Sequence, residues 1–159
     1  MANYSIEEKN SFTVLGIGTE IKSHYTDFVG INKEKADFWQ SINEDGTLEK
    51  LKSVASNDYL FVVNEAVNNK MMHYAGVMTE ESLPETTRLI EFPKGEYIVV
   101  KGEANSDEEL ANVLTGMAFG QVLGQVTEVS YVGGPNTAVI MGQKDGKVYG
   151  EMWIPVVRN

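Results

Sequence analysis

The chain has 159 residues, of which 42% are hydrophobic and 23% charged, as expected for one globular domain spanning 1–159 with a buried core. It contains no cysteine, which excludes disulfides and thiolate-bound metals. The formal net charge is −10, and the lysines and arginines are scattered, so direct binding to nucleic acid phosphates is not expected.

Sequence features favour a cytoplasmic protein without membrane contact. Glu7 and Glu8 lie near the N-terminus, where a secretory signal would carry an apolar segment. The apolar run Leu60–Val63 is far too short to cross a bilayer. An acidic surface attracts cationic small molecules through its field, but acidity also simply keeps a protein soluble, and composition does not separate these two roles.

In chain order, the residue patterns predict the same series of elements twice. The first series is strand, helix, strand and strand, at Phe12–Ile21, Lys33–Val54, Tyr59–Val63 and Lys70–Met78. The second series has the same order, at Glu96–Lys101, Asp107–Leu123, Thr137–Met141 and Lys147–Val157. Hairpin links are expected over Asn64–Asn69 and Gly142–Gly146.

This duplication predicts an α+β fold. Two pseudo-symmetric β-α-β-β repeats, about 4–80 and 86–157, would form a mainly antiparallel sheet with the helices on one face. The seam between two curved half-sheets is a natural place for a ligand cleft.

Helix boundary signals refine the helical segments. The first helix should begin near Asn32 and break at Asn43–Gly46, after which Thr47 can cap a second segment. Ser106 opens the next helix in a capping-box pattern with Glu109. Its end carries glycines at four-residue spacing, which predict a frayed or tightly packed helix end: Gly116, Gly120 and Gly124.

The last strand assigns its side chains to two faces. Alternation places Tyr149, Glu151 and Trp153 on one face and an aliphatic series, which should pack under the helices, on the other. A carboxylate between two aromatic rings suits a cationic or aromatic ligand. The alternative is an exposed face on which the rings pack against neighbouring strands and Glu151 is solvated, and spacing does not decide between the two.

Several short stretches, in this order and spacing, resemble the GyrI-like small-molecule-binding domains, the effector-binding domains of multidrug-responsive transcription activators. The stretches are Phe12–Ile17, Phe38–Trp39, His73–Val77, Phe92–Val100, Gly134–Pro135 and Glu151–Val156. The resemblance covers most of the chain and implies a duplicated β-α-β-β fold. It also implies a receptor for drug-like compounds, among them cationic aromatic ones, held between the halves.

The chain departs from this family at one important position. After the Gly-Pro turn the family usually carries a glutamate that projects into the cleft, as an acidic contact or as the acid/base group of hydrolytic relatives. Ala138 stands at that position here, and Ile140 stands where the family has tyrosine. Alanine cannot transfer a proton, so the departure weakens an enzymatic interpretation and also the expectation of a cationic ligand.

Other chemistry finds little support in the sequence. His24 and His73 are the only histidines, and neither has metal-ligand spacing, so no metal site is expected and His73 is interpreted as a half-buried strand residue. Gly16 and Gly18 resemble the start of a dinucleotide-binding motif, but the third glycine and the following helix are missing. No cofactor is expected.

The sequence therefore favours a stand-alone binding protein that sequesters or senses a small organic ligand. A hydrolase on the same fold and a regulator that binds a protein target such as DNA gyrase are the alternatives. We expect the ligand in the groove between the halves. The family resemblance implies Trp39, Tyr74 and Tyr97 as contacts, face alternation indicates Glu151 and Trp153, and Phe38 and Met117 are expected as neighbours.

Overall fold

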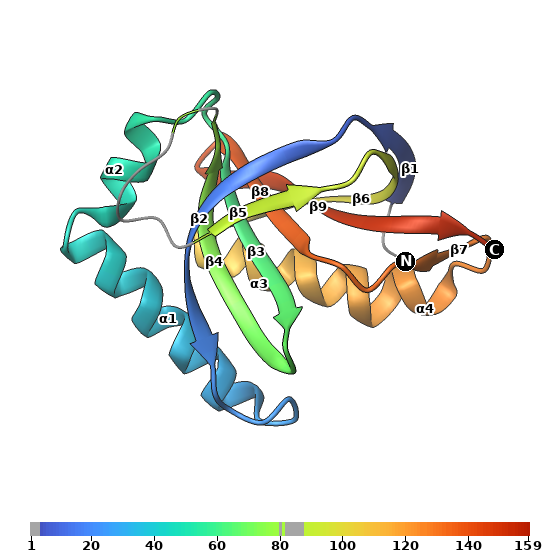
Figure 1. Cartoon of the computed structure of the whole chain (residues 1–159), viewed down its shortest axis with the longest axis horizontal. Helices are drawn as coiled ribbons and strands as arrows, with labels where there is room; N and C mark the ends of the chain where they lie inside the picture. Colours follow the sequence, from blue (N-terminus) through green and yellow to red (C-terminus); the bar gives the residue numbers. More distant parts are fainter. Residues whose placement is uncertain (1–3, 80, 82–87) are drawn as a thin grey trace.

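A computed structural model describes residues 4–79, 81 and 88–159 of the chain (Figure 1). The strands in the described residues are β1 Tyr4–Lys9, β2 Phe12–Ile21, β3 Leu60–Val67, β4 Lys70–Met78, β5 Arg88–Phe92, β6 Gly95–Ala104, β7 Val129–Tyr131, β8 Asn136–Lys144 and β9 Lys147–Arg158. The helices are α1 Phe28–Glu44, α2 Thr47–Ser53, α3 Asp107–Met117, the π-helical turn η1 Ala118–Val122 and α4 Leu123–Gln125. The fold is α+β, as the sequence predicts.

The strands form one sheet in the order β1-β6-β9-β8-β3-β4-β2-β5, with β7 paired to β9. Every strand pair is antiparallel. The predicted repeat is confirmed by the strand order. From the centre of the sheet outward, the first half contributes β3, β4 and β2, and the second half contributes the corresponding strands β8, β9 and β6. The halves meet where β3 pairs with β8, and Val62 lies opposite Ala138 at the middle of this seam.

Two long bent strands close the curl of the sheet. The chain runs from β1 into β2 and from β5 into β6, and β1 pairs with β6 while β2 pairs with β5. Lys9 pairs with Gly95 and Phe12 pairs with Phe92. Between these two pairs, both the β1–β2 segment and the β5–β6 segment advance by three residues, so the pairing register is the same on the two sides of the bend. The strand β1, which leads into the first half, therefore pairs with β6 of the second half, and β5, which leads into the second half, pairs with β2 of the first (Figure 1).

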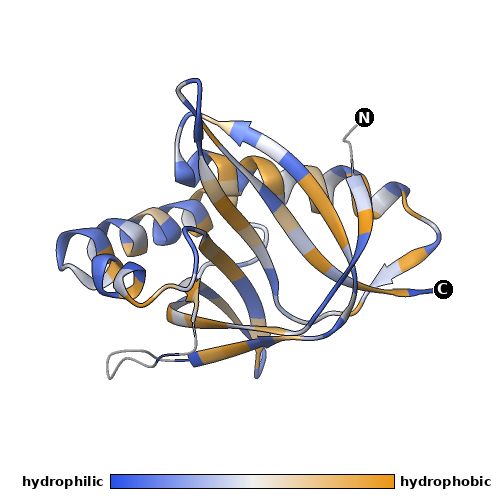
Figure 2. Ribbon diagram, turned by 90° about the horizontal axis from the view of Figure 1, so that it is seen from above, coloured by the Kyte–Doolittle hydropathy of each residue, from blue (hydrophilic) through white to orange (hydrophobic). Residues whose placement is uncertain are grey.

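The curled sheet has a core on each face. On the outer face, strand residues such as Val62, Met152 and Ile154 pack with Leu51 of α2 and Leu114 of α3. The inner face, inside the curl, is filled mainly by aromatic and β-branched side chains. Figure 2 shows the hydrophobic colour concentrated along the strands. The expected packing of the aliphatic face of β9 under the helices is observed.

Helix α1 begins earlier than predicted. Its first residue is Phe28 rather than a residue near Asn32, because the Asp27 carboxylate accepts a hydrogen bond from the Gly30 amide over 3.0 Å and caps the helix. Helix α2 begins at Thr47, but the Thr47 side chain is not its cap. The preceding Gly46 takes the cap position with a φ of 82°.

The hairpins are tighter than the sequence predicts. The β3–β4 link is a two-residue turn at Asn68 and Asn69, whose φ values of 53° and 64° fit the left-handed turns that match strand twist. The β8–β9 link is likewise formed by Asp145 and Gly146, with φ values of 55° and 76°. Residues that the sequence assigned to loops therefore extend the strands.

The glycine-containing end of α3 is a change of helix type. Ser106 caps α3 as predicted, and its side chain accepts from the Glu109 amide over 3.2 Å. After Met117 the helix widens into the π-helical turn η1 and then continues as the short helix α4.

The division of one domain into halves of about 4–80 and 86–157 stays a prediction, since residues 80 and 86 lie outside the described part.

Within the described residues, no helix has the length and apolarity needed to cross a membrane.

Candidate functional site

A cavity of about 480 Å³ lies on the outer face of the sheet, between α1 and α2 of the first half and α3 of the second. It straddles the seam, because its floor includes Val62 of β3 and Ile140 of β8. Leu48 and Val148 add apolar surface to the floor and walls. The volume falls in the range that small organic ligands occupy. A cavity therefore lies at the seam between the halves, on the face of the sheet that the helices cover.

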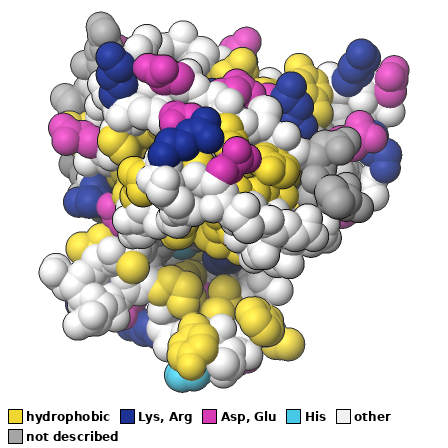
Figure 3. All heavy atoms as spheres, turned by 90° about the vertical axis from the view of Figure 1, so that its right-hand side faces the viewer, with side chains coloured by type: hydrophobic (Ala, Val, Ile, Leu, Met, Phe, Trp, Pro, Cys, Tyr) yellow, Lys and Arg dark blue, Asp and Glu magenta, His cyan; other side chains and the backbone are white. Residues whose placement is uncertain are grey.

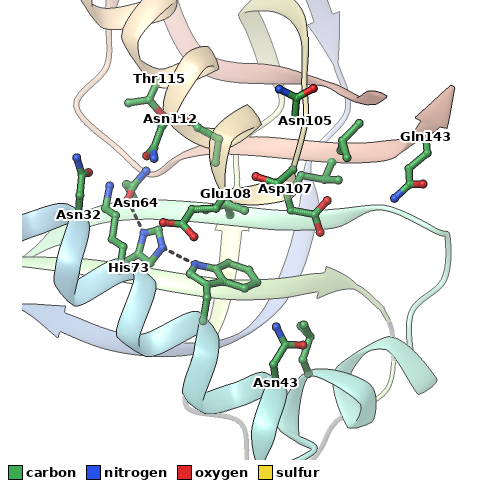
Figure 4. A pocket seen from close by; sticks show the side chains of 18 of the residues that line it. Asn32, Asn43, Asn64, His73, Asn105, Asp107, Glu108, Asn112, Thr115 and Gln143 are labelled. Carbon is green, nitrogen blue, oxygen red and sulfur yellow. Dashed lines mark hydrogen bonds between the residues drawn. The ribbon is translucent and has the colours of Figure 1, made fainter. Parts of the chain in front are cut away.

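One face of α1 forms the first wall. Asn32, Lys35, Trp39 and Asn43 line the cavity, at the spacing that places residues on one side of a helix. The opposite wall is α3, which contributes Glu108, Asn112 and Thr115 among others. Figure 4 shows Asn32 and Thr115 at one end of the cavity and Asn43, Asp107 and Gln143 toward the other.

Trp39 and His73 form a hydrogen-bonded pair at the base of the cavity. The Trp39 indole N–H donates to His73 Nε2 over 2.9 Å (Figure 4). Phe38 packs edge-on against the same imidazole, with ring centroids 5.9 Å apart. Because the indole donor is bonded to His73, Trp39 offers a ligand only its ring surface.

His73 is neutral and its tautomer is fixed. Since Nε2 accepts from Trp39, the ring proton is on Nδ1, which donates to Asn64 Oδ1 over 2.8 Å. His73 is only 2% exposed, and burial, with a smaller effect from the Lys35 charge, lowers its pKa from 6.5 to about 3. Both ring nitrogens are engaged within the protein, so His73 positions its neighbours and is not free to act as a base.

Charged side chains of both signs line the cavity. Lys35 and Lys52 come from the first half, and Asp107 and Glu108 come from the first turn of α3. Desolvation lowers the pKa of Lys35, whereas Lys52 is exposed. The formal charges of these four residues cancel, although the positive and negative groups come from different walls.

A hydrophobic surface continues past the Asn32 end of the cavity. Phe28, one turn before Asn32 on α1, is 71% exposed, and its neighbours Tyr25 and Val29 are also exposed. Figure 3 shows hydrophobic side chains gathered on the lower part of the face where α1 begins.

The residues predicted for the site are separated by the sheet. Trp39 lines the cavity. Phe38 and Met117 are half-buried and pack into the outer core, and neither is among the described residues that line the cavity. Phe38 touches the site indirectly, through the rings of Trp39 and His73.

The other four predicted residues lie on β4, β6 and β9 and do not line the cavity. Tyr74, Tyr97 and Trp153 are buried in the inner core. The Tyr97 hydroxyl donates to the Pro93 carbonyl over 2.6 Å, and burial raises the pKa of Tyr97 to about 12. Glu151 accepts from the Trp153 indole over 2.8 Å. Alternation correctly separates Trp153 from the aliphatic residues of β9, but the face that carries Trp153 points into the curl of the sheet and away from the cavity.

Sequence reasoning missed the polar part of the cavity. The sequence predicts Asn64 in a hairpin link and His73 at a half-buried strand position, and it indicates no site role for Glu108. The one available signal was the helical spacing of Asn32, Lys35, Trp39 and Asn43, which places two amides and an amine on the Trp39 face.

The structure also explains how the cleft accommodates Ala138. This residue is 1% exposed in the outer core, opposite Val62 at the seam. The cavity therefore has an apolar floor, and its carboxylates come from α3 instead of from the sheet. Figure 4 shows the Glu108 side chain reaching from α3 toward His73.

Comparison with known families assigns the chain. A family model described as Cass2, integron-associated effector binding protein, matches residues 5–156. The chain belongs to this effector-binding family. No curated protein sequence matches the chain.

Several solved structures share the fold of this chain, although their sequences are less than 20% identical to it. A putative bacterial transcription regulation protein from Staphylococcus aureus MU50 is 16% identical, with a TM-score of 0.75 and coverage of 98% of this chain and 99% of that one. The protein SAV2435 bound to tetraphenylphosphonium is 17% identical, with a TM-score of 0.75 and coverage of 98% and 94%. An integron cassette protein of Vibrio cholerae is 10% identical, with a TM-score of 0.65 and coverage of 97% and 95%. The GyrI-like effector-binding fold expected from the sequence is confirmed.

Proposed function

We propose that this protein binds a small aromatic organic molecule in the cavity between α1 and α3, to sequester it or to sense it, without converting it. The observation that carries the proposal is the cavity itself, which combines an apolar floor at the seam with the ring of Trp39 in its wall. Aromatic surfaces contribute much of the affinity in such sites. Membership of an effector-binding family and the tetraphenylphosphonium complex of a structural neighbour support it.

A cationic aromatic group suits one part of this cavity. Glu108 and Asp107 line it from α3, within the same cavity as the Trp39 ring. A ligand cation would gain a carboxylate partner and a ring face, which together replace part of its lost hydration. The net charge of −10 also raises the local concentration of cations.

A hydrolytic role has no comparable support in the geometry. The buried base nearest the cavity is His73, and its two nitrogens are bonded to Trp39 and Asn64. The position at which the family carries a carboxylate on the sheet is Ala138, which cannot exchange protons.

The two tryptophans provide a direct test, because Trp39 lines the cavity and Trp153 lies in the core on the other side of the sheet. In a Trp153→Phe background, Trp39 is the only tryptophan. We expect tetraphenylphosphonium to change its fluorescence in a saturable way and to raise Tm. A ligand at about 100 times Kd should add about 2.7 kcal/mol to the free energy of unfolding.

Matched charge variants locate the cation. Glu108→Gln should weaken tetraphenylphosphonium binding about threefold to tenfold, the usual effect of one partly exposed carboxylate. Glu109→Gln is the control, because Glu109 is in the same first turn of α3 and does not line the cavity. The proposal fails if cationic dyes, lipophilic amines and anionic metabolites all leave Trp39 fluorescence and Tm unchanged.

A further inference from the structure

Lys35 is an unusual cation for a surface helix. Its side chain lines the cavity and is half-buried. Within the described part of the chain, no carboxylate lies within ion-pair distance of its amine, whereas Lys33 on the same helix pairs with Asp37 over 2.9 Å. A desolvated ammonium without a partner is costly, and the cost falls when an anion binds beside it.

Asn64 supplies a second donor to the same cavity. Its amide oxygen accepts from His73 Nδ1, and the tautomer of His73 requires that orientation. The Asn64 amide nitrogen is therefore the remaining polar group, and no described acceptor is hydrogen-bonded to it. Asn64 lines the cavity, so this –NH₂ is available to a ligand (Figure 4).

Lys35 and Asp107 lie toward different ends of the cavity, and Glu108 reaches from α3 toward His73 between them. Lys35 is within one turn of Asn32, and Figure 4 places Asn32 and Thr115 at one end. Asp107 lies toward the other end, with Gln143. The Trp39 ring lies between these ends, one turn beyond Lys35 on α1.

We propose that the ligand is amphoteric: an aromatic molecule whose carboxylate, or a similar anionic group, binds Lys35 and Asn64 while its positive group faces the α3 carboxylates. This inference rests on the proposed function and names its ligand class. Two charge-assisted donors on one carboxylate form the strong type of hydrogen bond. A purely cationic ligand would leave the Lys35 ammonium unpaired and place a second positive charge near it.

The test uses two dyes with the same ring system. Rhodamine B has a cationic ring system and a free carboxylate, and its ethyl ester has the same ring system without the negative charge. We expect the parent chain to bind rhodamine B about tenfold more tightly than the ester, measured by fluorescence anisotropy. Lys35→Met should abolish this preference, and its Tm should not fall, because the variant removes a desolvated charge and keeps a long unbranched side chain.

Two further variants make the assignment specific. Lys33→Met is the control: it makes the same change on the same helix but outside the cavity, and it should keep the tenfold preference. Asn64→Asp keeps an oxygen for His73 and replaces the donor nitrogen with an acceptor, so it should also remove the preference.

The possible outcomes separate this inference from the proposed function. Equal binding of both dyes, tighter binding of the ester, or a preference that survives Lys35→Met overturns the amphoteric ligand and leaves small-molecule binding intact. Binding of tetraphenylphosphonium without any binding of rhodamine B overturns it as well. If the parent chain binds none of the three compounds, this inference is overturned, and the proposed function fails with it when the lipophilic amines and anionic metabolites also leave Trp39 fluorescence and Tm unchanged.

Discussion

At the scale of single residues, the site depends on one buried histidine that organises two neighbours. His73 orients the indole of Trp39 through Nε2 and the amide of Asn64 through Nδ1. The arrangement needs a neutral ring, because a protonated imidazole has no acceptor for the indole N–H. The low pKa of His73 is therefore a requirement of the cavity geometry, and it makes the fold sensitive to acid.

We expect His73 to destabilise the fold as pH falls. The pKa of His73 is about 3 in the folded state and near 6.5 in the unfolded state. Between these values only the unfolded chain is protonated at this residue, so the contribution of His73 to stability is complete above pH 6.5 and is lost as pH falls toward 3. The slope should reach at most about 1.4 kcal/mol per pH unit. Urea unfolding of the parent and of His73→Gln at pH 7, 6, 5 and 4 measures it. Parallel pH profiles of the two proteins would contradict this account.

At the scale of elements, glycines allow side chains to cross neighbouring strands inside the curl. The ring of Tyr74 on β4 lies over Gly18 of β2, and its hydroxyl donates to Glu65 over 3.2 Å. Glu65 also accepts two hydrogen bonds of 2.8 Å from Arg88 of β5. Gly18, which in the sequence resembles part of a nucleotide-binding motif, thus has a packing role.

Gly18→Ala should destabilise the protein by about 1–3 kcal/mol, because the added methyl would lie 2.2 Å from Tyr74 Cδ1 and the buried ring has little room to move. Gly116→Ala is the matched control on α3. A methyl there meets nothing within 4 Å, and we expect it to stabilise the fold by about 0.5–1 kcal/mol. Urea denaturation of both variants gives the comparison, and equal effects of the same sign would show that the ring does not constrain Gly18.

The positions of these helices and strands also show which parts of the site could be predicted from the sequence. Alternation in β9 correctly separated Glu151 and Trp153 from the aliphatic residues, and helical spacing placed Trp39 on the cavity face of α1. Neither pattern tells which face of the sheet is enclosed by the curl. The curl depends on pairing of β1 with β6 and of β2 with β5, which joins residues from opposite halves of the chain, and local periodicity carries no information on such pairing.

Local patterns failed for Asn64 for a related reason. An asparagine before a turn is typical of a loop, so the sequence predicts that Asn64 lies in the hairpin link. In the structure Asn64 is a strand residue opposite Asn136 across the seam, and its role follows from the His73 ring on the adjacent strand. Only the register of β3 with β4 brings these two side chains together.

At the scale of the whole molecule, the charge distribution favours small ligands over nucleic acid. The net charge is −10, and several cations are committed to carboxylates. Arg158 forms two hydrogen bonds of 2.9 and 2.7 Å with Glu96, and Arg88 is held by Glu65. The 13 lysines and arginines are outnumbered by 23 aspartates and glutamates and are scattered, so a role in transcription would require the DNA contact to come from elsewhere.

We therefore expect this chain to show no measurable binding to random duplex DNA near physiological salt, because it would release few counterions from the phosphates. Fluorescence anisotropy of a labelled duplex, with and without the ligand identified by the Trp39 assay, provides the measurement. Tight binding that weakens steeply with added salt would contradict the expectation.

The continuous ladder formed by the two bent strands has a mechanical consequence. Because the strand leading into each half pairs with the other half, the halves are interlocked at two places, along this ladder and along the β3–β8 seam. A hinge at the seam would have to shear the ladder, breaking many backbone hydrogen bonds at once. The floor of the cavity is thus a rigid platform, and adaptation to ligands of different shape falls to α1, α2 and the side chains that they carry.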